Sequence, residues 1–476
     1  MRRERLRSSL ALLLACLTAA GSATAAPITM ERKLGEEFVA EARRGLPMIK
    51  DYRLNRFISG IGNRYVDTLG KQPFDYQFFV INDSSINAFA VPGGKIFINA
   101  GLVSRSDNEG ELAGVMGHEV AHSHAHHSVR QQEKAAVANY AGLLGVFLMV
   151  INPVLGQAAL SASMGQQLKY QRDFEREADF IGIDLSKKAG YDPAAMLGLL
   201  RKLYEEQQAH PTLLPPYFMS HPLTGERMAY LEAALGKNEW QVERRPPTME
   251  FERMQATARA HSETRRQAVP QYERRLAEAK TDEERADALE LIGLLMVQGE
   301  EYEGGLGYLE KAEVTGREVD RELGRAYLRE GMLDKAEPRL RRVVAKSPGD
   351  WDAAGDLGEL LYQQGHYDKA SRSLQRSHDL HPYRPHVMEA LARAMDKVGR
   401  RGAGFYYLAG ASELRSQAQQ AKSYYARAAE SMPADDPLRA ELDVKMGALV
   451  EAEPRIPDSH QRPGRFHGEP VGDLER

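Results

Sequence analysis

The chain contains the hexapeptide Gly117-His118-Glu119-Val120-Ala121-His122, which is an HExxH motif. The preceding residues Ser106 to Glu109 have the spacing of a capping box, so a helix carrying the motif is expected to begin there. On a helix, His118 and His122 share one face, where two neutral imidazoles can bind one zinc ion at about 2.0–2.1 Å. Glu119 lies beside the first ligand and can act as general base toward a water on the metal.

A third zinc ligand is expected from a helix further along the chain. A histidine six residues after His122, as in the metzincins, is absent because Ser128 stands there. The pattern instead predicts a helix over residues 166–189, which contains Glu175 and Asp179. Glu175 is the candidate ligand, and Asp179 can accept a hydrogen bond from the far nitrogen of a ligating histidine. Two histidines and one glutamate leave a fourth position for water, which predicts a hydrolytic site with one Zn²⁺ per chain.

The C-terminal half is helical throughout and repeats with the tetratricopeptide period. Positions of one unit recur 34 residues later: Leu323, Gly324, Ala336, Leu340 and Pro348 become Leu357, Gly358, Ala370, Leu374 and Pro382. A shorter copy with Gly293 and Leu309 precedes them. Small residues let the two helices of a unit pack closely, and stacked units form a concave surface suited to binding another polypeptide.

Composition excludes several classes of protein. The 476 residues are 42% hydrophobic and 27% charged with a net charge of −4, which is typical of globular domains rather than disordered or multi-span membrane chains. The balance of charge gives no reason to expect a nucleic-acid partner. Cys16 is the single cysteine, so we expect no internal disulfide.

Residues 1–25 have the three parts of a secretory signal peptide. Basic residues at positions 2–7 precede an apolar run over 10–20, and Ala23-Thr24-Ala25 offers a cleavage site. The alternative is a lipobox that ends at Cys16, which would leave the mature chain lipid-anchored. Either reading predicts export.

The remaining chain is expected to form two domains and a tail. Residues 31–245 mix helical and strand periodicities, residues 266–452 form the repeats, and residues 453–476 read as a flexible tail. Residues 135–151 carry no formal charge, and a buried or membrane-brushing helix is favoured there over a true span. Residues 156–168 are a candidate flap.

Together with Asn87-Ala88-Phe89-Ala90-Val91-Pro92-Gly93-Gly94-Lys95-Ile96, these motifs resemble the CAAX-prenyl-protease-like zinc metallopeptidases, here followed by tetratricopeptide repeats. The resemblance implies an α+β zincin-like domain, mostly helical with a small sheet, and then an all-α solenoid. It implies zinc on His118, His122 and Glu175, with Glu119 as the base. It further implies a periplasmic endopeptidase that degrades or chaperones outer-membrane β-barrel proteins, the repeats binding such unfolded proteins or the barrel assembly machinery. Peripheral membrane contact is compatible with this reading.

Other residues are weaker candidates. Asn87, Ala88 and Phe89 adjoin a predicted hairpin whose edge could pair with an extended substrate. His221, in a His-Pro pair that matches a further family position, either donates to the oxyanion or occupies zinc's fourth position and holds the enzyme inactive. Tyr217 is a possible oxyanion or substrate contact, whereas His124, His126 and His127 read as polar helix residues. The rival function is a periplasmic chaperone or adaptor whose metal site is structural or latched.

Overall fold

The computed structural model describes residues 27–134, 164–209, 216–235 and 247–451. The expected signal peptide, Cys16, the uncharged segment 135–151, most of the candidate flap 156–168 and the tail 453–476 lie outside the described residues. No helix within the described ranges is long and apolar enough to cross a membrane.

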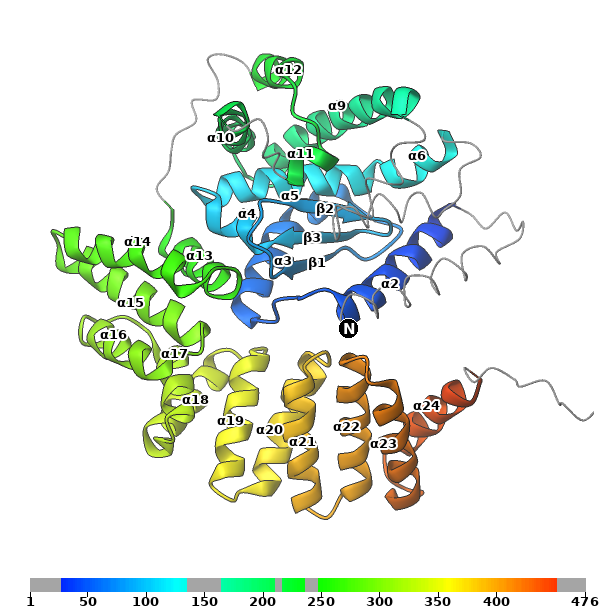
Figure 1. Cartoon of the computed structure of the whole chain (residues 1–476), viewed down its shortest axis with the longest axis vertical. Coiled ribbons are helices and arrows are strands. Elements are labelled where there is room, and N and C mark those ends of the chain that lie inside the picture. The colour runs from blue at the N-terminus through cyan, green and yellow to red at the C-terminus, as the bar shows by residue number, and fades with distance from the viewer. Residues whose placement is uncertain (1–26, 135–163, 210–215, 236–246, 452–476) are drawn as a thin grey trace, which may run out of the picture.

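The first part of the chain builds a small sheet flanked by helices (Figure 1). Its elements are α2 (Pro27–Gly45), α3 (Tyr52–Val66), η1 (Asp67–Leu69), β1 (Gln77–Ile81), β2 (Ala88–Val91), β3 (Lys95–Asn99), α4 (Ala100–Arg105), α5 (Glu109–His124), α6 (His127–Lys134), α9 (Met164–Lys188), α10 (Ala195–Ala209), α11 (Pro216–Ser220) and α12 (Gly225–Leu235). The strand order is β1-β3-β2, with β1 parallel and β2 antiparallel to β3. The predicted hairpin is therefore confirmed, and β2 is an edge strand.

Alternation along β3 separates two hydrophobic layers. Ile96 and Ile98 face the core that contains α3 and α5, whereas Phe97 faces α2 and packs beside Val39. All five residues of β3 are buried, because this central strand is covered on both faces. One face of the sheet thus packs against the helix that carries HExxH.

The helix α5 begins two residues later than the capping box suggested. Asn108 is its N-cap and accepts a hydrogen bond from the backbone of Glu111 at 3.1 Å. Ser106 instead ends α4, where its hydroxyl donates to the carbonyl of Leu102. The predicted second helix is confirmed as α9, which packs along α5 and ends before Gly190, whose φ of +80° stops it.

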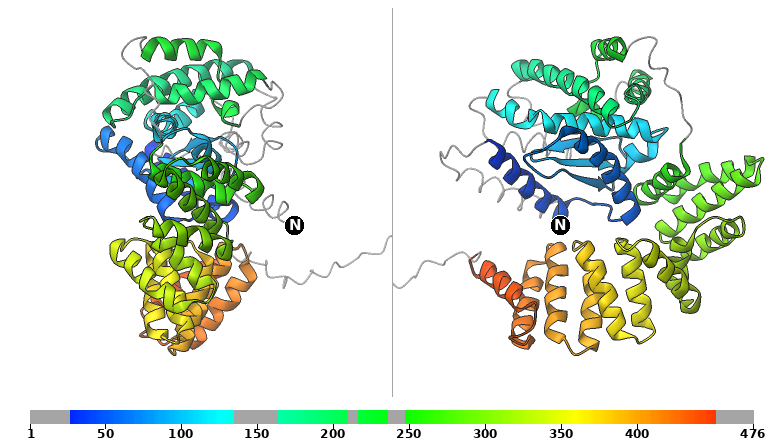
Figure 2. Two further views of the ribbon diagram at one scale, coloured as in Figure 1. Left: turned by 90° about the vertical axis from the view of Figure 1, so that its left-hand side faces the viewer. Right: turned by 180° about the vertical axis from the view of Figure 1, so that it is seen from behind.

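The second part is an all-helical array. Its elements are α13 (Met249–Ser262), α14 (Arg265–Glu278), α15 (Asp282–Gln298), α16 (Tyr302–Val314), α17 (Asp320–Arg329), α18 (Leu333–Lys346), α19 (Trp351–Gln363), α20 (Tyr367–Leu380), α21 (Pro385–Lys397), α22 (Arg401–Leu414), α23 (Ala418–Ser431) and α24 (Arg439–Glu451). Figures 1 and 2 show these helices as an arc that bends around the first part on the side of α2.

The repeated glycines have a packing role within the helix pairs. A Cβ atom on Gly324 would lie 2.9 Å from Leu340, and one on Gly358 would lie 2.6 Å from Leu374. Real Cβ atoms do not approach so closely, so glycine is what lets the two helices of a pair meet. The same contact explains why glycine and leucine recur together in the sequence.

The two parts share a helix and a buried polar junction. Phe251 and Met254 of α13 lie in the core of the first part, whereas Ala256 packs against α14 and α15. The residues left unassigned between the two predicted domains are therefore a joint component of both. At the junction, the backbone N–H of Tyr52 donates to Asp352 at 2.8 Å, and the indole of Trp351 donates to the carbonyl of Lys50 at 2.9 Å.

Candidate metal centre

The helix α5 places two imidazoles one turn apart. The Nε2 atoms of His118 and His122 lie only 3.0 Å from each other. His118 is fully buried, and His122 is partly exposed. The spacing of the motif therefore produces the shared face that the sequence predicts.

Two further side chains from other elements complete the cluster. Glu175 of α9 lies 3.4 Å from Nε2 of His118 and 3.3 Å from Nε2 of His122. Nδ1 of His221, which follows α11, lies 3.3 Å from Nε2 of His118 and 3.0 Å from Glu175. These four residues form a group that could hold one metal ion.

The donor set fits zinc. Four ligands at about 2.0–2.1 Å in a tetrahedron stand about 3.3 Å apart. The separations of 3.0–3.4 Å between the nitrogen and oxygen atoms of this cluster match that figure. Two imidazoles and one carboxylate are also the ligand types of catalytic zinc sites. His221 stands at the corner that the three-ligand prediction left for water.

Burial and charge set the protonation of the ligands. Burial lowers the pKa of His122 to about 3, so its imidazole is neutral. Burial also acts to lower the pKa of His118, but hydrogen bonds to Asp179 and Glu175 outweigh it and raise that pKa to about 9. Burial acts to raise the pKa of Glu175, yet His221 and the guanidinium of Arg227 hold it well below its usual range, so Glu175 is a carboxylate.

Glu119 is fully buried beside the cluster. Among the described residues, no donor meets the geometry of a hydrogen bond to either carboxylate oxygen, although the backbone N–H of Ala90 lies close enough to favour the charged form. Oε1 lies 3.3 Å from Nε2 of His221. Burial raises the pKa of Glu119, although His221 and His118 partly oppose that effect. A buried carboxyl without a fixed donor, next to a metal-ligand group, is suited to exchanging protons with a bound molecule.

Asp179 supports His118 from behind. Its Oδ1 lies 3.0 Å from Nδ1 of His118, the nitrogen that faces away from the cluster. Arg227 donates to both Asp179 oxygens at 2.8 and 2.9 Å, and Tyr230 donates to Oδ2. Arg227 also lies 2.8 Å from Glu175, so one guanidinium holds both acids of α9. The sequence offered little sign of this role, because the pairing spans 48 residues.

His221 is held by Tyr217. The two rings are stacked with centroids 4.8 Å apart. The Tyr217 side chain is buried, and its hydroxyl has no hydrogen-bond partner among the described residues. Tyr217 thus fixes the plane of the His221 ring at the fourth corner of the cluster.

The three candidate substrate residues lie along the edge strand. Asn87 is buried just before β2, and its side-chain oxygen has no partner within the part of the chain that the structure describes. Ala88 faces the core shared with α5. Phe89 faces the other side of the sheet and stacks on Phe97 with centroids 5.1 Å apart. A peptide on this strand would therefore meet the Phe89 backbone and not its ring.

The helix of the motif ends at His124, before His126 and His127. His126 has a left-handed φ of 53° and separates α5 from α6. Its Nδ1 lies 2.7 Å from Glu31 of α2, which ties this break to the N-terminal helix. The prediction that these histidines are polar helix residues and not ligands is confirmed for His124, which ends α5, and for His127, which begins α6, whereas His126 lies in the turn between the two helices.

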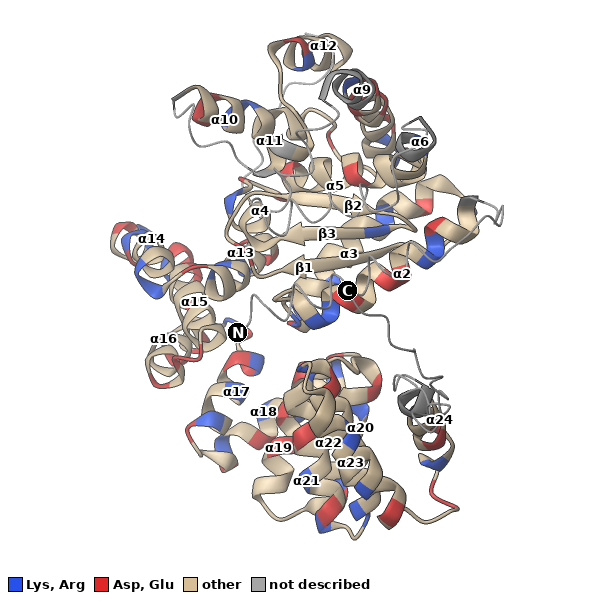
Figure 3. Cartoon of the chain, turned by 45° about the vertical axis from the view of Figure 1, so that its right-hand side comes forward, with Lys and Arg blue, Asp and Glu red and all other residues tan. Residues whose placement is uncertain are grey.

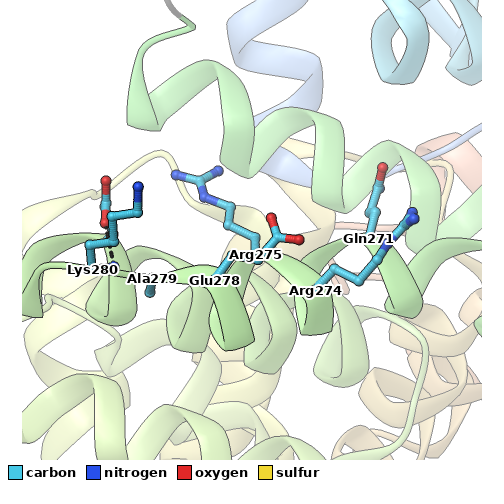
Figure 4. Close-up of a pocket in the computed structure, with 7 residues that line it drawn as sticks. Gln271, Arg274, Arg275, Glu278, Ala279 and Lys280 are labelled. Carbon is cyan, nitrogen blue, oxygen red and sulfur yellow. Dashed lines mark hydrogen bonds between the residues drawn. The ribbon is translucent and has the colours of Figure 1, made fainter.

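A separate open hollow lies on α14 and the start of α15 (Figure 4). Its lining is polar and consists of Gln271, Arg274, Arg275, Glu278, Ala279, Lys280 and Glu284. Arg275 is engaged with Glu252 at 2.7 Å. This hollow lies in the helical array, and its lining lacks the histidines that converge between α5 and α9.

Comparison with known proteins agrees with this geometry. Residues 53–235 match peptidase family M48. Residues 327–394 match a tetratricopeptide repeat family. The first part is thus an M48 peptidase domain, and the predicted metallopeptidase resemblance and repeats are confirmed.

Several curated proteins are similar to the peptidase domain. The β-barrel assembly-enhancing protease of Escherichia coli is 34% identical over 220 residues, which cover 44% of this chain and 45% of that protein. The mitochondrial metalloendopeptidase OMA1 of Schizosaccharomyces pombe is 29% identical over 210 residues, or 43% of this chain and 61% of its own. The solved structure of MamA (AMB-1) covers 35% of this chain and 98% of its own at a TM-score of 0.29 and 24% identity. The match to the Escherichia coli protein thus spans less than half its length.

Proposed function

We propose that the chain is a zinc-dependent endopeptidase acting in outer-membrane protein assembly and quality control. The observation that carries the proposal is the convergence of His118, His122 and Glu175 with metal-ligand spacing beside the buried carboxyl of Glu119. The match of this domain to peptidase family M48 supports it.

The chain's own residues divide the work. Zinc, when bound, polarises a peptide carbonyl and lowers the pKa of a water. Glu119 takes a proton from the attacking water and delivers it to the leaving amine. Asp179 keeps the far nitrogen of His118 protonated, so that the other nitrogen presents its lone pair to the metal.

The edge strand β2 supplies a place for an extended substrate. It pairs only with β3 in the described sheet and lies against α5. A peptide that added to its open side would run past the metal cluster, and main-chain hydrogen bonds would hold it independently of its sequence. Asn87 immediately precedes this strand, and Ala88 is its first residue.

The link to outer-membrane proteins rests on the relatives and the repeats. Relatives named β-barrel assembly-enhancing proteases match the peptidase domain, and tetratricopeptide arrays bind polypeptides. We therefore infer that unfolded or misassembled outer-membrane proteins, or the barrel assembly machinery, dock on the repeats. This places the mature chain in the periplasm, exported by residues 1–25 or anchored through Cys16.

The direct test is Glu119→Gln with an unfolded outer-membrane β-barrel protein as substrate. The variant should lose about 10²- to 10⁴-fold in cleavage rate, because its amide cannot accept the proton. Its zinc content should stay near one per chain. Glu109→Gln, at the partly buried start of the same helix and away from the metal cluster, is the matched control and should cleave as the wild type does. Undiminished cleavage by Glu119→Gln would refute the mechanism.

The second candidate is a chaperone or adaptor with a latched metal site. It is favoured by one observation, namely that Nδ1 of His221 stands 3.0–3.3 Å from the atoms of Glu175 and His118. If His221 latches the metal, His221→Ala should raise proteolysis, and if it serves the oxyanion, the same change should lower it. A wild-type protein that suppresses aggregation of the substrate but never cleaves it would favour this candidate.

A further inference from the structure

His122 makes a contact on the side that faces away from the metal cluster. Its Nε2 points into the cluster, 3.3 Å from Glu175. Its Nδ1 lies 2.9 Å from Nδ1 of His127. On an unbroken helix, residues five apart lie about 140° apart around the axis and cannot meet in this way. The left-handed residue His126 breaks the helix and brings the His127 ring back over His122.

The proton positions in this contact are determined by the metal-binding role of His122. A neutral imidazole that offers the Nε2 lone pair to a metal carries its hydrogen on Nδ1. Nδ1 of His127 must then be the acceptor, and the His127 hydrogen lies on Nε2. That nitrogen is 3.3 Å from Oε2 of Glu177, which is ion-pair distance but outside hydrogen-bond geometry. The direction that suits all three groups therefore runs from His122 through His127 toward the carboxylate.

The surroundings hold His127 in place. Its side chain is 5% exposed, and its ring lies on Phe174 with centroids 4.6 Å apart. Glu177 accepts hydrogen bonds from Arg130 at 2.8 and 3.0 Å, which fixes the carboxylate at the end of the chain. The His127 ring is therefore held by packing and by polar contacts, unlike the ring of a polar surface residue.

We propose that His127 is a positioning residue of the metal centre, which accepts the Nδ1 hydrogen of His122 and links it to Glu177. This inference rests on the proposed zinc site. Three acids of α9 would then act on the same site. Glu175 faces the metal, Asp179 supports His118 directly, and Glu177 supports His122 through His127. The hydrogen bonds orient both imidazoles and make each a stronger electron donor toward the metal.

The test is zinc affinity of the full chain, measured by competition with a chromophoric chelator. His127→Phe keeps the ring packing on Phe174 but removes the acceptor, and zinc affinity should fall about 10- to 100-fold. His127→Asn retains an acceptor oxygen near the place of Nδ1 and should recover most of the loss. The melting temperature of the metal-free protein should change little in either variant, because the contact matters chiefly when His122 binds metal.

The outcomes separate this inference from the proposed function. His118→Ala should bind no zinc at this site, and a wild type that binds no more zinc than His118→Ala overturns the metal centre itself. If the wild type binds zinc and His127→Phe binds it equally tightly, only the role of His127 is overturned. The role of His127 is also overturned if the Phe and Asn variants lose zinc affinity equally and their metal-free forms melt at a lower temperature. Should His127→Phe not fold, Glu177→Met decides, because it removes the acceptor at the partly exposed end of this contact; weaker zinc binding is expected, and unchanged binding refutes the proposal.

Discussion

Replacing Arg321 with methionine should loosen the junction between the peptidase domain and the repeats. The guanidinium of Arg321 is buried on α17 and contacts three carboxylates. It lies 2.9 Å from Asp350, 2.9 Å from Asp352 and 3.3 Å from Asp51, the N-cap of α3 in the peptidase domain. Figure 3, in which the ribbon is coloured by residue type, shows acidic and basic residues interspersed along the helical array. Removal of this one cation leaves buried negative charge without its partner.

The expected cost follows from that burial. Removing one member of a buried ion pair typically destabilises a protein by about 3–5 kcal/mol. Asp352 keeps the Arg384 guanidinium at 2.7 Å, and Asp350 keeps the backbone N–H groups at the start of α19, so both remain partly compensated. Asp51 retains the amide of Gln298 at 3.0 Å, a neutral donor. Asp51 also keeps the backbone N–H of Leu54 at 2.9 Å, but this donor too is neutral. Part of the loss should therefore fall on Asp51 and hence on the contact between the domains.

A tryptophan at the junction supplies the assay. The ring of Trp351 meets Tyr52 of the peptidase domain edge to face, with centroids 4.8 Å apart. The chain has two tryptophans, so in a Trp240→Phe background Trp351 alone reports on this contact. Its fluorescence transition in urea should move to lower urea in Arg321→Met, by about 3–5 kcal/mol in free energy.

The matched control is the exposed ion pair of Lys346 with Glu318, whose side chains are 63% and 84% exposed. Lys346→Met should cost less than about 1 kcal/mol. An Arg321→Met transition no lower than that of Lys346→Met would refute the reasoning, because the buried network would then contribute nothing beyond an ordinary surface pair.

Three further predictions concern acid, helix packing and metal. Burial acts to raise the pKa of Asp51, but Arg321 and Arg53 hold that pKa well below its usual range. The junction should therefore be intact near pH 7 and weaken as the pH falls below about 4, and the Trp351 fluorescence would report this change. A junction that becomes more stable toward acid would contradict this sign. Gly358→Ala should cost about 1–3 kcal/mol in urea unfolding, because the new Cβ would lie 2.6 Å from Leu374, whereas Gly307→Ala, with nothing within 4 Å, should be neutral or stabilising. Chelation should lower the melting temperature, since zinc present at 100 times its Kd contributes about 2.7 kcal/mol, and a melting temperature insensitive to chelator would argue against a bound metal.

The local parts of the site were predictable from sequence. His118 and His122 share a face because four residues make about one helical turn, and neither needs another element to do so. Glu175 and Asp179 were found by the same spacing on a second helix. The repeats were predictable because close helix packing demands a small residue opposite a large one in every unit, and that demand recurs as Gly324 with Leu340.

Other contacts depended on how distant segments meet. His221 reaches the cluster from a position 46 residues after Glu175, and no periodicity encodes which corner it takes. His127 is a polar helix residue as the sequence predicts, but the turn at His126 that brings its ring to His122 leaves no mark in the helical pattern. Asp51, just before α3, connects the peptidase domain to the repeats. Its role as a helix cap is local, but the guanidinium that it contacts belongs to Arg321, 270 residues away.

The sequence alone therefore determined the metal-ligand types, the two helices that carry them and the helix-pair repeat, since each depends on spacing within one element. Only the tertiary structure decided that a fourth histidine faces the ligands, that a helix break returns His127 to His122, and that the repeats dock on the peptidase domain through buried charge. These arise because folding brings together groups that are remote along the chain, and burial then makes their hydrogen bonds and charges strong enough to matter.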